Sequence, residues 1–246
     1  MTQLAGNLDI QPTVKLHEAE FDMREARFNM PRETARFNMI EQQIRTWEVL
    51  DPVVLALLNE IPREHFVAES QAGLAFADVE LPIGYGQTML SPKLEGRILQ
   101  AVAIKNTDKV LLIGTGSGYL TALLAKLAAH VHSVEINSAL SEIAQSRLAL
   151  EGINNATLSV GDGSVGWSAA APYNVIIYTG STQLRPIAAE KMLAVGGRLF
   201  VVTGEAPIMQ ANLTQRVSED AFRHETLFET CLPLLVNAPL TSKFEF

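Results

Sequence analysis

At Val110-Leu111-Leu112-Ile113-Gly114-Thr115-Gly116-Ser117-Gly118-Tyr119, an apolar run leads directly into three glycines at alternate positions. The apolar run predicts a buried strand, and the residues from Gly118 onward predict a helix. In open α/β sheets, ligands bind at the carboxyl ends of strands, where glycines let the backbone approach a nucleotide. A dinucleotide fingerprint requires G-x-G-x-x-G, but Tyr119 stands where the last glycine would be. The G-x-G-x-G spacing therefore favours a cofactor without phosphates.

Strands and helices alternate around this stretch. Apolar runs predict strands at 109–113, 131–136, 157–160, 174–179 and 198–203, and helical patterns occur at 118–129, 138–150 and 187–193. Near-continuous apolar strands separated by helices predict a parallel sheet that is covered on both faces. Two extended runs near the end, 208–217 and 222–232, have no helix between them and predict an antiparallel pair. The expected fold class is α/β, a doubly wound, mostly parallel Rossmann-like sheet with N-terminal helices and antiparallel C-terminal strands.

The chain before the sheet divides into two parts. Residues 1–33 are polar and weakly patterned, and we expect them to form an N-terminal extension. From Thr34, apolar residues recur at helical spacing, and Asp51-Pro52 predicts the start of a second helix that continues to Leu58. We therefore expect residues 34–246 to form a single domain, in which 34–80 are N-terminal helices.

Composition excludes several classes of protein. The 246 residues are 48% hydrophobic and can bury one substantial core, and no apolar run is long enough for a membrane span. The first residues lack the apolar run of a secretory signal, and Cys231 is the only cysteine, so we expect a cytoplasmic protein whose cysteine is buried. A net charge of -8 without a dense Lys/Arg cluster argues against nucleic acid as a partner.

Two acidic residues follow the next strands. Glu135 ends the second predicted strand, where a carboxylate can accept hydrogen bonds from both ribose hydroxyls. Asp162 lies between Gly161 and Gly163 after the third strand, where it can reach an adenine edge. Singly, each feature also suits a turn or a solvated strand end. Their occurrence at three successive strand ends favours one adenosine site.

These residues form part of an ordered series of motifs. The series is LPIGYGQT (81–88), IGTGSGY (113–119), SVE (133–135), GDG (161–163), GW (166–167), APY (171–173) and GGRL (196–199). It resembles the protein-L-isoaspartate O-methyltransferases over roughly 36–234, and IPREHFV (61–67) is similar to that family as well. The resemblance implies a class I methyltransferase that transfers a methyl group from S-adenosyl-L-methionine to a carboxylate of damaged aspartyl residues in proteins.

The resemblance also implies the site residues by their positions in these motifs. The cofactor-binding residues it implies are Thr88, Met89, Ser91, Gly114, Thr115, Gly116, Ser117, Gly118, Tyr119, Glu135, Ile136, Asp162 and Gly163. The active-site loop is 81–93, and its candidate catalytic residues are Gln87, Thr88, Leu90, Ser91 and Lys93.

Three positions depart from the family pattern. Leu90 stands where the family usually has a serine, and the next residue, Ser91, precedes a proline in a pattern that equally predicts a helix N-cap. Leu112 replaces a glutamate that usually leads into the glycines, and Asn174 replaces a common aspartate. The departures concern the acceptor side and the orientation of the glycine loop.

Methylation of a carboxylate requires no general base, because a free carboxyl group with a pKa of about 4 is already ionised at neutral pH. The enzyme must place an oxygen in line with the methyl carbon and exclude water. Lys93 is a candidate partner for the substrate carboxylate, although a solvated lysine in a first helical turn is an equal alternative; if it is the partner, Lys93→Ala raises KM. The five histidines show no metal-ligand spacing, and we expect no metal.

Three other functions are compatible with parts of the pattern. A methyltransferase of a different acceptor would use Met89 and Leu90 as an apolar wall, but a hydroxyl acceptor needs a base that the loop does not clearly offer. A non-catalytic homologue would bind S-adenosyl-L-methionine without turnover, as the departures at Leu90 and Leu112 allow. A nicotinamide dehydrogenase is disfavoured by the glycine spacing. The sequence does not specify the oligomeric state.

Overall fold

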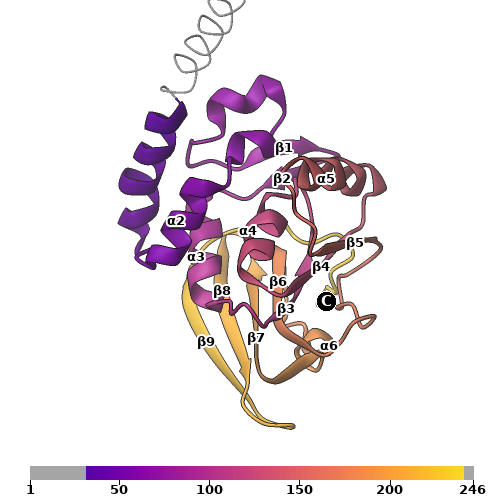
Figure 1. Ribbon diagram of the computed structural model, residues 1–246. Helices are drawn as coiled ribbons and strands as arrows, with labels where there is room; N and C mark the ends of the chain where they lie inside the picture. Colours follow the sequence, from indigo (N-terminus) through magenta and orange to yellow (C-terminus); the bar gives the residue numbers. More distant parts are fainter. Residues whose placement is uncertain (1–31, 241–246) are drawn as a thin grey trace, which may run out of the picture.

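The computed structural model describes residues 32–240 (Figure 1). The predicted N-terminal extension therefore lies outside the described residues except for its last two positions. A seven-stranded sheet has the order β5-β4-β3-β6-β7-β8-β9. The strands are β3 Lys109–Ile113, β4 His130–Glu135, β5 Ala156–Val160, β6 Tyr173–Thr182, β7 Leu193–Glu205, β8 Ile208–Arg216 and β9 Phe222–Glu229. The first five strands in this order pair in parallel, and the last two pairings are antiparallel, which confirms the expected fold class.

Local patterns predicted most of these elements closely. Strand β3 and helix α5, Ser138–Leu150, have the predicted bounds, and helix α4 covers Tyr119–Leu127. The Asn137 side chain caps α5 by accepting from the backbone N–H groups of Ala139 and Leu140. Helix α6, Ile187–Glu190, is much shorter than predicted, because the chain after Glu190 turns directly into β7 at Leu193.

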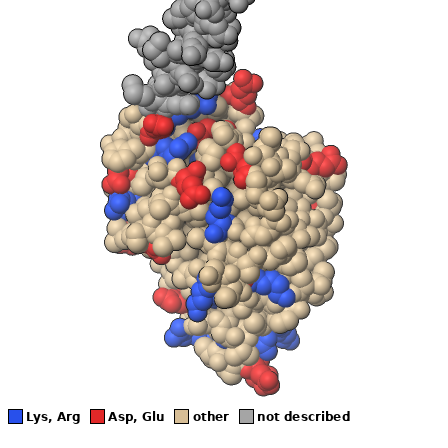
Figure 2. Space-filling model, in the orientation of Figure 1, with Lys and Arg blue, Asp and Glu red and all other residues tan. Residues whose placement is uncertain are grey.

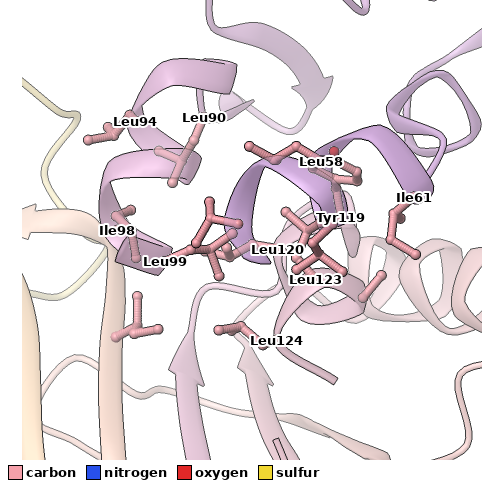
Figure 3. Packing of buried hydrophobic residues seen from close by; sticks show 14 of the residues in the cluster. Leu58, Ile61, Leu90, Leu94, Ile98, Leu99, Tyr119, Leu120, Leu123 and Leu124 are labelled. Atoms are coloured by element: carbon pink, nitrogen blue, oxygen red, sulfur yellow. The ribbon is translucent and has the colours of Figure 1, made fainter. Parts of the chain in front are cut away.

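The core has two layers because side chains alternate across the sheet. Val110 and Leu112 of β3 contact the larger cluster, whereas Leu111 and Ile113 contact a smaller cluster on the opposite face. The larger cluster packs under α2 (Pro52–Glu60), α3 (Pro92–Val102) and α4, as Figure 3 shows. The opposite face is covered by α6 and by loop residues such as Trp167 rather than by long helices.

The N-terminal segment packs beside these helices. After a helical stretch at 32–38, the chain forms a π-helical turn, η1 (Met39–Ile44), and a 3₁₀ turn, η2 (Arg45–Trp47). Ile40 and Ile44 are buried, but Phe37 and Trp47 are exposed, so the predicted apolar stripe faces the core only in part. Two further 3₁₀ turns, η3 (Arg63–Phe66) and η4 (Glu69–Leu74), lead to the hairpin.

The predicted active-site loop is mostly a β-hairpin. Strands β1 (Leu81–Gly84) and β2 (Gln87–Met89) pair antiparallel. Tyr85 and Gly86 form the turn and both have positive φ, as a two-residue hairpin turn of the primed type requires. Helix α3 follows immediately, so the hairpin is fixed to a helix that is part of the core.

Surface features bear on two further expectations. Figure 2 shows, on the described part of one face, Lys and Arg side chains scattered among Asp and Glu rather than gathered in one patch. Within 32–240, no helix has the length and apolar character needed to cross a bilayer. The expectation that Cys231 is buried is wrong: its side chain is exposed, two residues after the edge strand β9 ends at Glu229.

Candidate active site

A cavity opens at the carboxyl ends of the parallel strands. Its walls come from the ends of β3, β4, β5 and β6, from hairpin strand β2, and from a C-terminal segment at 233–236. Parallel sheets bind ligands at this edge, because the loops that leave neighbouring strands converge there. The cavity is therefore the candidate active site.

The glycine loop allows this close convergence. Gly114, Gly116 and Gly118 all have positive φ, a backbone conformation that L side chains rarely adopt. At Gly114, an added Cβ atom would lie 2.1 Å from the Thr179 Oγ1 atom, which is itself 3.0 Å from the Ile113 carbonyl oxygen. The glycine loop and the end of β6 are thus packed against each other at a distance that only glycine permits.

Glu135 supports the glycine loop and also faces the cavity. Its Oε2 atom accepts a hydrogen bond from the Gly116 N–H at 2.9 Å, and its Oε1 atom accepts from the Asn137 N–H at 3.0 Å. The side chain is buried at the end of β4 and lines the cavity. Since a carboxylate has about four acceptor positions, two remain for donors such as ribose hydroxyls.

Asp162 is the second carboxylate of the cavity. Its Oδ1 atom accepts from the Ser164 N–H at 2.8 Å, and its Oδ2 atom accepts from the Asn237 side-chain amide at 2.9 Å. The hydrogen bond from the Ser164 backbone is the main cause that lowers the pKa of Asp162 below its ordinary value. The side chain is therefore ionised at neutral pH and can accept a further hydrogen bond from the cavity.

The cavity carries a negative charge. Among the described residues that line it, only Glu135 and Asp162 bear charged side chains. Such a cavity favours a ligand that is cationic or rich in hydrogen-bond donors. No group of three or more His, Cys, Asp or Glu residues within 32–240 is arranged to hold a metal ion.

The structure brings most of the predicted site residues together. The predicted residues that line the cavity are Gln87, Thr88, Leu90, Gly114, Gly116, Glu135, Ile136, Asp162 and Gly163. Side-chain alternation turns others away from it: Met89 points into the core, and the Thr115 hydroxyl lies 2.6 Å from that of Ser133. Ser117 and Tyr119 are buried, and Gly118 packs against Ala144.

Ser91 and Lys93 lie in a neighbouring cavity instead. Ser91 occupies the N-cap position of α3, but its side chain makes no capping hydrogen bond. The Lys93 ammonium lies 2.7 Å from an Asp78 carboxylate oxygen and 4.2 Å from the centroid of the Trp47 ring. In this arrangement, Lys93 already has a counter-ion.

The family departures are accommodated by apolar packing and by the backbone. Leu112 is fully buried between the sheet and the helices. Contacts from Thr179, Glu135 and Ser133 hold the glycine loop without it. Asn174 accepts a hydrogen bond from the Lys109 backbone N–H at 2.9 Å, which aligns the starts of β3 and β6.

Two parts of the site were not predicted from the sequence. The C-terminal segment 233–236 forms one wall, and it is held by the hydrogen bond from the Ser181 N–H to the Pro233 carbonyl at 2.8 Å. A buried ion pair joins Arg63 to Glu95 behind the hairpin. The only sequence signal for this pair is that Glu95 interrupts the apolar face of α3.

The sheet order and the position of the cavity define the class: this is a Rossmann-like class I methyltransferase fold. A solved protein-L-isoaspartate O-methyltransferase has a TM-score of 0.71 and 25% identity, and the match covers 81% of this chain and 65% of that one. A second solved structure, a Plasmodium falciparum protein described as a putative member in complex with S-adenosyl-L-homocysteine, has a TM-score of 0.69 over 82% of this chain and 97% of that one. At 17% identity, it supports the fold alone.

Sequence relatives then identify the family. Residues 34–237 match the family described as protein-L-isoaspartate(D-aspartate) O-methyltransferase. The Protochlamydia amoebophila protein-L-isoaspartate O-methyltransferase is 45% identical over 192 residues, which cover 77% of this chain and 90% of that protein. A Rhodopseudomonas palustris protein-L-isoaspartate O-methyltransferase is 40% identical, over 78% of this chain and 79% of that one. The chain belongs to the protein-L-isoaspartate O-methyltransferase family, as its motifs indicated.

Proposed function

We propose that this protein transfers a methyl group from S-adenosyl-L-methionine to the carboxylate of an isoaspartyl residue in a protein or peptide. The observation that carries this proposal is the acidic cavity, in which the glycine loop, Glu135 and Asp162 meet directly beside the hairpin residues Thr88 and Leu90. Membership of the family supports the same reaction.

The residues of the cavity fit the cofactor. Glu135 retains acceptor positions for the two ribose hydroxyls, and Asp162 is an ionised acceptor suited to the amino group of adenine. The backbone of Gly114 and Gly116 lines the cavity, so the methionine part of the cofactor can pass close to it. When bound, the cofactor supplies an electrophilic methyl group on a cationic sulfur, and the negative cavity favours that charge.

The acceptor is expected at the hairpin wall of the cavity. Thr88 and Gln87 can donate hydrogen bonds there, and the Thr88 hydroxyl now donates to a Glu80 carboxylate oxygen at 2.9 Å. Leu90 adds an apolar surface that excludes water from the reacting oxygen. A carboxylate acceptor suits this wall, because it is ionised without the help of a base.

The proposed substrate also indicates which partners the protein meets, and the cysteine content indicates its location. Damaged proteins or peptides are the partners, and an isoaspartyl side chain must leave its own fold to reach a cavity that lies within this one. A cytoplasmic location agrees with the single cysteine, since a chain with one cysteine cannot form an internal disulfide.

A second candidate is methyl transfer to a different acceptor. It is favoured by Leu90, which places an apolar side chain in the cavity wall where the family usually has a serine. An apolar wall beside the reacting atoms suits a substrate that is less polar than a carboxylate.

Methyl-labelled S-adenosyl-L-methionine offered with an isoaspartyl peptide tests the two candidates. We expect a base-labile methyl ester on the isoaspartyl peptide and none on its aspartyl counterpart. The variant Leu90→Ser is the companion: a large gain of ester formation supports the family chemistry. If neither the wild type nor Leu90→Ser forms the ester although both bind the cofactor, a different acceptor is favoured.

A further inference from the structure

Arg63 has an unusual position for a charged side chain. It lies in η3, remote from the cavity in sequence, and only 1% of its surface is exposed. Its Nε atom donates to the Ala75 carbonyl at 2.9 Å, its Nη1 atom pairs with Glu95, and its Nη2 atom donates to the Leu90 carbonyl at 2.5 Å. All three nitrogen atoms of the guanidinium therefore have a hydrogen-bond partner, an arrangement that the single ammonium group of a lysine cannot reproduce.

The guanidinium also contacts the cofactor side of the site. Its carbon lies 5.0 Å from the ring centroid of Tyr119, the first residue of α4 after the glycine loop. Leu90, whose carbonyl it holds, lines the cavity on the acceptor side. Figure 3 shows Leu90 and Tyr119 in the same buried cluster, with Leu90 just before α3 and Tyr119 at the start of α4. One buried cation therefore contacts both elements between which the methyl group is to pass.

The desolvation of two buried charges can cost as much free energy as their attraction returns, so this ion pair need not stabilise the fold. A buried pair can often be replaced by apolar residues of similar volume without loss of stability, so burial by itself is no reason for Arg63 to be charged. The contacts that an apolar side chain cannot replace are the hydrogen bonds to the Ala75 and Leu90 carbonyls, and of these only the bond to Leu90 reaches the hairpin. That bond sets the direction of the peptide unit that joins the hairpin to α3.

We infer that Arg63 is a positioning residue for the active-site hairpin: by holding the Leu90 carbonyl while packing on Tyr119, it sets the distance between the acceptor wall and the glycine loop. Glu95 is the counter-ion that keeps the guanidinium in place. The inference rests on the proposed function for its effect on turnover. Its structural part, an ordered hairpin, does not depend on which acceptor is methylated.

The chain offers a matched control. Arg36 and Glu64 form a second ion pair in the same region, with N and O atoms 2.6 Å apart and with side chains that are also mostly buried. Arg36 packs over Phe76 and donates to the Asn59 carbonyl, and none of these contacts reaches the hairpin. Loss of this pair removes a comparable interaction without touching the Leu90 carbonyl.

The test uses the full chain as the double variant Arg63→Met/Glu95→Leu, which leaves no unpaired buried charge, and the control Arg36→Met/Glu64→Leu. Hydrogen exchange of the amides at 86–94 is measured with S-adenosyl-L-homocysteine bound, and kcat is measured with an isoaspartyl peptide. We expect exchange at 86–94 to rise and kcat to fall at least about tenfold in the first variant, since a misplacement of about 1 Å can cost about a hundredfold. The control should leave both within about threefold.

The outcomes separate the inference from the proposed function. If the first variant folds and shows unchanged exchange at 86–94 and unchanged kcat, the positioning role is overturned. If the wild type methylates no isoaspartyl peptide, the proposed function fails, and the exchange measurement still decides the role of Arg63. Should the double variant not fold, Arg63→Lys is used in its place, because it keeps the charge opposite Glu95 but loses the planar set of three nitrogen donors. Faster exchange at 86–94 and a lower kcat are again expected, and no change in either overturns the positioning role.

Discussion

Substitution of Gly114 by alanine tests how the glycine loop and β6 fit together. Gly114 has a φ of 91°, and an alanine Cβ atom would lie 2.1 Å from the Thr179 Oγ1 atom, far inside contact distance. The Thr179 hydroxyl cannot simply turn away, since it bridges the carbonyl oxygens of Ile113 and Gly114 at 3.0 and 3.1 Å. The substitution therefore strains the backbone and displaces a bridging side chain.

The cost is the sum of three effects. A positive φ costs an L residue about 1 to 2 kcal/mol. Overpacking costs about 1 to 3 kcal/mol, and the reduced freedom of the unfolded alanine chain returns about 0.4 to 1 kcal/mol. We expect Gly114→Ala to lower the free energy of unfolding by about 3 kcal/mol, or roughly 6 to 12 °C in Tm for a chain of this size.

Thr179→Ala is the partner in a double-mutant cycle. Without the hydroxyl, the nearest atom to the new Cβ is the Thr179 Cβ at 3.4 Å, so the double variant relieves the overpacking but keeps the backbone strain. Urea unfolding of the four proteins should show that the double variant is more stable than the sum of the single effects by at least about 1 kcal/mol. Strict additivity would refute the close packing of Gly114 on Thr179.

Three other predictions concern single side chains. Glu135→Gln removes the charged acceptor for the ribose and should raise the calorimetric Kd for S-adenosyl-L-homocysteine about tenfold to a hundredfold, whereas Glu142→Gln, on the exposed face of α5, should leave it unchanged. Burial raises the pKa of Glu95 from its ordinary value of 4.5 to about 7, against the opposing effect of Arg63. The folded protein then retains a proton that the unfolded chain releases, so the free energy of unfolding should fall as pH rises from 4.5 to about 7, and this fall should be missing in Glu95→Gln. Ser181→Ala leaves the buried Leu232 carbonyl without its 2.9 Å hydrogen bond and should destabilise by about 1 to 3 kcal/mol in thermal unfolding, and an unchanged Tm would show that this bond does not hold the C-terminal segment.

Local sequence patterns were sufficient to predict the elements that depend mainly on residues close together in the sequence. The bounds of β3 and α5 followed from apolar runs and caps, and the cavity residues Glu135 and Asp162 followed from their places after strands. In a parallel sheet, the strand ends converge, so positions after successive strands predict a shared site. The fold and the cofactor side of the site were predictable for this reason.

Long-range contacts were not predictable in this way. The pair of Arg63 and Glu95 joins positions 32 residues apart, and the wall at 233–236 depends on Ser181, some fifty residues earlier. Periodicity also placed Trp47 with the core, whereas it packs on Lys93 at the surface. Helical spacing identifies a stripe, but only the tertiary fold decides how much of the stripe is covered.

The most direct test of the central claim is a methyl-transfer assay with labelled S-adenosyl-L-methionine and a matched pair of peptides, one with an isoaspartyl residue and one with a normal aspartyl residue. We expect base-labile label on the isoaspartyl peptide alone, and a loss of that label in the Glu135→Gln protein at limiting cofactor. Label that survives base, label on both peptides, or binding of S-adenosyl-L-homocysteine without any transfer would contradict the claim.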